Sequence, residues 1–153
     1  MVATRSRARH ARIAADGEGD RIILTVRSGT AGGYRVVLGA VSVPPPYLEQ
    51  VVHDPSHPRF PYWRKAGLVV LGGSQPVSVA VPPRWRARAA ITWGNTPVVP
   101  ALRIASCPAA AGGAWNAYAG GFLLRDRSAC LPLRFRVGAR TTTVRFGVGR
   151  RCR

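Results

Sequence analysis

The chain has 153 residues, 46% of them hydrophobic, and a formal net charge of +17 at pH 7. This size suits one domain with a core of its own, and the apolar content excludes a largely disordered chain. The longest strongly apolar stretch, residues 67–73, is far shorter than the ~20 residues that a membrane-spanning helix needs. Lys65 is the only lysine among the 23 basic side chains. Arginine suits phosphate, sulfate or carboxylate partners, although a GC-rich genome also produces an arginine-rich composition.

Residues 1–20 are polar and charged and show no periodicity that would bury a face, so we predict a disordered basic tail. An incidental solvated tail is favoured over a basic arm for nucleic acid or anionic lipid. Met1–Ala15 has a basic start but no apolar segment behind it, so no leader is visible. Residues 21–153 are predicted to form a single domain.

That domain is punctuated by Gly and Pro, which separate short runs rich in β-branched and aromatic residues. One turn of helix is an option in Tyr47–Val52, after the triple proline 44–46. The predicted strands are Arg21–Arg27, Tyr34–Val43, Gly67–Leu71, Val77–Val81, Arg84–Trp93, Ala101–Ser106, Phe122–Arg125, Leu131–Val137 and Thr142–Val148.

Three of these runs alternate clearly between apolar and polar residues. Leu131, Leu133, Phe135 and Val137 share one side of their strand. The same pattern holds in 142–148 and 84–93, and it places arginines on the outward side. A strand with one apolar and one polar side is typical of an antiparallel sheet that packs one face on the core and exposes the other to solvent. We therefore predict an all-β antiparallel β-sandwich, immunoglobulin-like in type, with an open barrel as the alternative and a hairpin around Gly138–Thr141.

The three cysteines are Cys107, Cys130 and Cys152. A Cys107–Cys130 bridge would close a Gly- and Ala-rich loop and contribute about 3 kcal/mol by chain entropy. Cys152 would then pair outside this chain or stay free, and three reduced cysteines in a cytosolic protein are the other interpretation. No cysteine and histidine spacing is typical of zinc.

Chemistry-bearing residues are sparse, so the expectation is a protein that is not an enzyme and uses no cofactor or metal. Of the six acidic residues, only Glu49, Asp54 and Asp126 lie outside the predicted tail. The sequence contains no nucleophile elbow and no phosphate loop. His53 and His57 are four residues apart, but Pro55 between them prevents a helical face that would aim both at one metal. The aromatic residues Trp85 and Trp93 are predicted core. Those in predicted loops, Tyr62, Trp63, Trp115 and Tyr118, are expected to plug the sandwich ends rather than to stack sugars or bases.

The C-terminal half resembles a group of small exported or membrane-anchored β-domain proteins of high-GC Gram-positive bacteria. The resemblance is carried by Trp85–Asn95, Ala101–Pro108, Trp115–Arg125, Ala129–Gly138 and Thr143–Cys152. It covers roughly residues 67–153 at the level of pattern, and the group has no assigned activity. The resemblance implies an exported β domain with a Cys107–Cys130 disulfide. The missing leader departs from that pattern and leaves the cytoplasm as the alternative location.

The functional expectation is a non-enzymatic domain of the cell envelope or the secreted space. It would bind an anionic surface polymer or a protein partner through outward arginines, with nucleic acid as the alternative partner. The candidate binding residues are Arg84, Arg86, Arg88, Arg134, Arg136 and Arg145.

Overall fold

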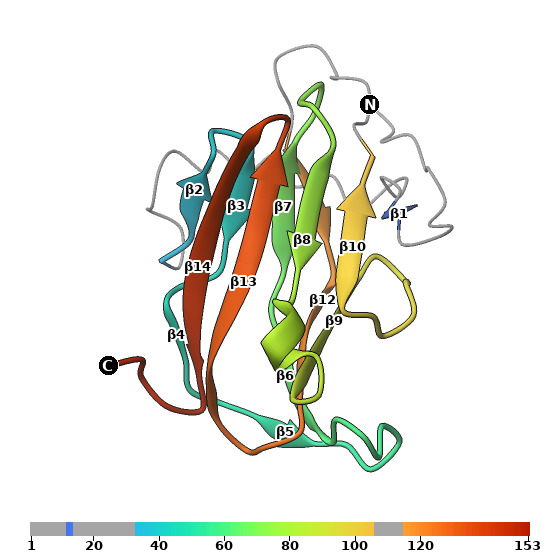
Figure 1. Ribbon diagram of the computed structural model, residues 1–153, viewed down its shortest axis with the longest axis vertical. Coiled ribbons are helices and arrows are strands. Elements are labelled where there is room, and N and C mark those ends of the chain that lie inside the picture. The colour runs from blue at the N-terminus through green and yellow to red at the C-terminus, as the bar shows by residue number, and fades with distance from the viewer. Residues whose placement is uncertain (1–11, 14–32, 106–114) are drawn as a thin grey trace.

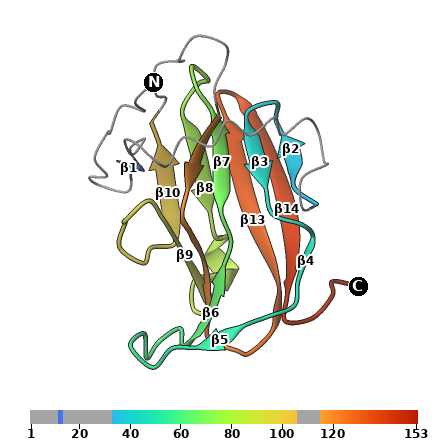
Figure 2. The same ribbon diagram turned by 180° about the vertical axis from the view of Figure 1, so that it is seen from behind.

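The computed structural model describes residues 12–13, 33–105 and 115–153, which form two β-sheet layers packed face to face (Figures 1 and 2). The layer toward the viewer in Figure 1 is one six-stranded sheet, here called the front sheet. Its strands, in spatial order, are β1 (Arg12–Ile13), β10 (Ala101–Ile104), β8 (Val77–Ala80), β13 (Ala129–Val137), β14 (Arg140–Val148) and β4 (Tyr47–Leu48). Neighbouring strands are antiparallel except at the two edges, where β1 and β4 pair in parallel.

The hairpin of β13 and β14 is the longest element of the front sheet. Its register runs without a break from Ala129 opposite Val148 to Val137 opposite Arg140. The predicted turn is confirmed at Gly138, whose φ of +59° suits glycine. Pro132 fits inside β13 because β8 pairs only from Arg134 onward, so this half of the strand has ladder bonds on one side.

The rear layer consists of two four-stranded sheets joined end to end (Figure 2). One contains β11 (Trp115–Tyr118), β7 (Leu68–Leu71), β3 (Val41–Val43) and β2 (Arg35–Val37). The other contains β5 (Val52–His53), β6 (Tyr62–Lys65), β12 (Gly120–Leu124) and β9 (Ala89–Trp93). Because β6 runs on into β7 and β11 into β12, the two sheets form one surface. At the junction, Ala66 N–H donates to the Gly120 carbonyl at 2.8 Å.

The core lies between the two layers and is built from the inward side of each strand. Trp93 and Phe122 meet edge to face with ring centroids 5.7 Å apart, and the Phe122 ring lies 5.2 Å from the Phe146 ring of the front sheet. Trp93 is fully buried, and its Nε1–H donates to the Ala66 carbonyl at 2.7 Å. This bond gives the buried indole the partner that it needs. A smaller cluster of Phe60, Ala90 and Leu123 lies apart from the main core.

The all-β antiparallel sandwich is confirmed, and the immunoglobulin-like type stays a prediction. Three local predictions are wrong. Tyr34–Val43 is two strands, because Leu38 and Gly39 turn the chain with φ of +51° and +66°. Arg84–Trp93 is a strand only from Ala89, and Tyr47–Val52 holds β4 and the first residue of β5 in place of a helical turn.

The predicted tail 1–20 and strand Arg21–Arg27 lie outside the described residues, apart from the two residues of β1. In the described part of the chain, no helix has the length and apolar character needed to cross a bilayer.

Candidate functional site

The outward side of the front sheet gathers four exposed arginines, here called the arginine face: Arg103, Arg134, Arg136 and Arg145. The strand register fixes how they lie. Arg103 of β10 and Arg136 of β13 are both directly opposite Ser78 of β8. Arg134 is two residues from Arg136 along β13, and Arg145 of β14 is opposite Pro132. Side chains two residues apart on a strand point to the same side, so the four guanidinium groups belong to one surface.

This face carries no acidic counter-charge within the described residues. Asp126 accepts hydrogen bonds from Arg88, Asp54 lies in the loop after β5, and Glu49 directly follows β4 and lines a different hollow. On β8, β10, β13 and β14, the other outward positions hold small or uncharged residues: Ser78, Ala80, Ala101, Cys130, Pro132, Thr141, Thr143 and Gly147. A surface of one charge sign attracts anions over distances of about a Debye length, ~8 Å at physiological salt.

A hollow of about 350 Å³ lies at the hairpin end of this face. Its lining is Pro76, Ser78, Arg103, Arg136 and Gly138. Arg136 Nε–H donates to the Gly138 carbonyl at 2.9 Å, which orients the guanidinium at the rim. The two arginines thus flank a small polar floor.

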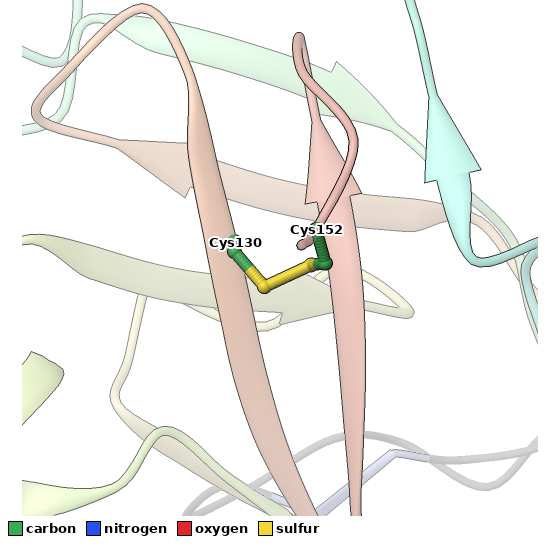
Figure 3. The surroundings of a disulfide bond; sticks show 2 residues. All are labelled: Cys130 and Cys152. Atoms are coloured by element: carbon green, nitrogen blue, oxygen red, sulfur yellow. A yellow bond between two sulfur atoms is a disulfide. The ribbon is translucent and has the colours of Figure 1, made fainter.

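The last residues of the chain fold back over the outward side of the front sheet. Cys152 forms a disulfide with Cys130 of β13, with the two Cα atoms 5.1 Å apart (Figure 3). This pairing replaces the predicted Cys107–Cys130 bridge, because Cys130 can form only one disulfide. Cys107 itself lies outside the described residues. The guanidinium carbon of Arg151 lies 4.4 Å from the centroid of the Tyr47 ring on β4, a cation–π contact.

The absence of a side chain at Gly147 gives this returning segment its room. A Cβ at Gly147 would collide with the Arg150 carbonyl and lie 3.0 Å from both Arg151 Cα and Cys152 N. Arg150, Arg151 and Arg153 are exposed. Arg145 lies two residues before Gly147 on β14, on the same side of the strand. The returning segment therefore adds positive charge close to Arg145.

Three of the predicted binding residues do not lie on the arginine face. Arg84 lies in a 3₁₀ helix, η1 (Pro83–Trp85), and Arg86 and Arg88 follow in the turn before β9. Pro82 and Pro83 prevent β8 from continuing, since proline supplies no ladder donor and favours the start of a helical turn. Arg88 is engaged within the protein: it donates to Asp126 Oδ2 at 3.1 Å and stacks on Trp85 at 4.6 Å.

The histidine segment 53–57 forms a self-contained loop. Asp54 Oδ1 accepts hydrogen bonds from the Ser56 hydroxyl at 2.6 Å and the Ser56 N–H at 2.9 Å, which lower the pKa of the Asp54 carboxyl. The His53 and Tyr62 rings contact each other edge to face, with their centroids 5.3 Å apart. Within the described residues, no three His, Cys, Asp or Glu side chains are grouped closely enough to hold a metal ion.

The aromatic residues predicted in loops lie on strands instead. Tyr62 and Trp63 belong to β6, and Trp115 and Tyr118 belong to β11. Trp63 packs against the small cluster around Phe60, and Tyr118 is buried. Trp93 is core as predicted, whereas Trp85 is half-buried under Arg88.

Sequence reasoning missed Arg103 and Arg151 as members of the basic surface. Arg103 had a detectable signal, because Leu102 and Ile104 alternate with it in a predicted strand. What the sequence does not reveal is that β10 and β13 lie on opposite sides of β8. Arg151 reaches the sheet only because of the Cys130–Cys152 pairing.

This chain matches no protein-family model, no curated protein and no solved structure. Its functional interpretation therefore depends on the geometry and charge of the surface just described.

Proposed function

We propose that this protein is a non-enzymatic binding domain of the cell envelope or the secreted space that holds an anionic, phosphate-bearing polymer on its arginine face. The observation that carries the proposal is the alignment of Arg103, Arg134, Arg136 and Arg145 on one sheet surface. None of the four forms an ion pair within the described residues. Guanidinium binds phosphate oxygens in bidentate fashion, and a row of such groups suits a ligand with repeated charges.

Two further features support this proposal. The Cys130–Cys152 disulfide is typical of oxidising compartments outside the cytoplasm, where secreted and envelope proteins operate. The arginine face is open and extended along the sheet, which suits a polymer better than a small substrate that an enclosed pocket would hold. An exported β domain, as the resemblance implies, fits the same interpretation.

The test compares two double variants that each remove two positive charges. In Arg134→Gln/Arg145→Gln the charges leave the arginine face, and in Arg84→Gln/Arg86→Gln they leave η1 and the turn after it. We expect the first to weaken binding of poly(glycerol phosphate) about tenfold or more at 0.1 M salt. The slope of log affinity against log salt should fall by about 2, roughly one for each phosphate group that an arginine no longer neutralises. Fluorescence anisotropy with a labelled polymer across a salt series measures both quantities.

The η1 double variant is the matched control, because it has the same net charge and should bind within about twofold of the wild type. Equal weakening by both variants would mean that net charge alone drives binding, and it would refute the proposal that the arginine face is the binding surface. A parallel series with duplex DNA tests the alternative partner. Preference for DNA over the glycerol phosphate polymer at equal salt would favour the nucleic-acid function over the envelope one.

A further inference from the structure

The register of three neighbouring strands brings two arginines to either side of one serine. Arg103, Ser78 and Arg136 form a single row across β10, β8 and β13. Neighbouring strands are ~4.8 Å apart, so the two arginine Cα atoms are roughly 10 Å apart with the serine midway. An extended arginine side chain spans much of that distance. Both guanidinium groups can therefore reach the space above Ser78 from opposite sides.

The floor of this space is polar and small. Ser78 is half-buried, and its hydroxyl has no hydrogen-bond partner among the described residues. The neighbouring outward position on β8 is Ala80, so no bulky side chain of that strand covers the serine. Together these residues leave the hollow of about 350 Å³ open between the two arginines.

The arginines of this row keep donors available for a ligand. Arg136 uses its Nε–H on the Gly138 carbonyl, which leaves both terminal nitrogens of the guanidinium without a partner in the described part of the chain. The side chain of Arg103 makes no hydrogen bond or ion pair to any described residue. The two groups repel each other, and an anion between them would relieve that repulsion.

We infer that the hollow between Arg103 and Arg136 is a discrete subsite for one phosphoryl group, with the Ser78 hydroxyl as a third donor. Donors that converge from two sides and from the floor match a tetrahedral oxyanion with oxygens in all these directions, better than they match a planar carboxylate. This inference rests on the proposed function, because the subsite lies within the arginine face. It adds that binding begins at one defined point rather than anywhere along the row.

The experiment is a titration of the ¹⁵N-labelled protein with inorganic phosphate at pH 7, with ionic strength held constant by sodium chloride. Saturable shifts are expected at the Ser78 amide and at the Nε–H groups of Arg103 and Arg136. Arg103→Gln and Arg136→Gln should each raise the phosphate Kd about tenfold, and Ser78→Ala should raise it several-fold. Arg84→Gln, which removes one exposed charge in η1 and off the arginine face, is the matched control and should leave the Kd within about twofold.

All four side chains are solvent-accessible, so their replacement should leave the fold intact, with amide shifts that change only near each substituted residue. An equal loss in Arg84→Gln, or shifts that grow linearly without saturation, would overturn the subsite. If the polymer binds while phosphate does not saturate, the subsite is refuted and the proposed function stands. If the glycerol phosphate polymer fails to bind and phosphate saturates, the proposed function is refuted instead.

Discussion

Replacing Gly121 by alanine is expected to lower the free energy of unfolding by about 3 kcal/mol and the Tm by about 6–12 °C. Gly121 begins the pairing of β12 with β6, where the strands approach closely at the junction of the two rear sheets. An added Cβ would collide with the Arg64 carbonyl and lie 2.9 Å from Ala66 N. Its φ of +157° adds strain for any residue with a side chain. Thermal unfolding followed by circular dichroism measures the change.

Gly39→Ala is the matched control for this prediction. Gly39 also has a positive φ, +66°, but an added Cβ there would meet no atom within 4 Å. Its cost should therefore be limited to backbone strain, about 1 kcal/mol. The difference between the two variants isolates the effect of the collision. Equal Tm values for both would show that the junction accommodates a side chain and would contradict the packing described for β6 and β12.

Reduction of the Cys130–Cys152 disulfide is expected to cost about 3 kcal/mol, the chain-entropy value for a loop with a sequence separation of 22. Guanidinium unfolding with and without dithiothreitol measures this cost. The Cys152→Ser variant should unfold at the midpoint of the reduced wild type, and reductant should not change it further. Titration of the denatured, unreduced wild type should detect one thiol per chain.

Cys107→Ser separates this pairing from the one that the resemblance implies. It should leave the stabilisation by the disulfide intact, because Cys107 is not one of the bonded pair. A loss of the reductant-sensitive stabilisation in Cys107→Ser would instead support the Cys107–Cys130 bridge. Peptide mapping of the oxidised protein identifies the linked cysteines directly.

The sandwich was predictable because alternation is a local property of the sequence. Leu131, Leu133 and Phe135 are buried on the side that the pattern indicates, and Arg134 and Arg136 are exposed on the other. The same reasoning failed at 84–88, where the alternation of arginine with Trp85 and Ala87 has the period of a strand. Pro82 and Pro83 favour a helical turn at this point, and their effect on the backbone outweighs the strand-like alternation of side chains. The hydrophobic pattern alone does not show which of the two effects prevails.

The candidate site was only half predictable, since it depends on which strands become neighbours. Arg134, Arg136 and Arg145 follow from the pattern of one hairpin, in which sequence neighbours are also neighbours in space. Arg103 joins them through pairings that β8 makes with β10 on one side and β13 on the other. Such long-range pairings depend on the whole sandwich. The cysteine pairing has the same origin, because three thiols allow more than one bridge and spacing does not choose among them.

The disulfide has a consequence for the order in which the molecule assembles. Its two cysteines enclose only the β13–β14 hairpin and the short segment after it, so the bond joins parts of the chain that are already close in sequence. A hairpin closes within microseconds, whereas the pairing of β13 with β8 must join segments more than fifty residues apart. The hairpin can therefore form before β13 pairs with β8, and the slower oxidation of the two cysteines, which takes seconds to hours, then fixes it. β13, the strand with which β8 pairs, is then already part of a formed hairpin when the rest of the front sheet assembles.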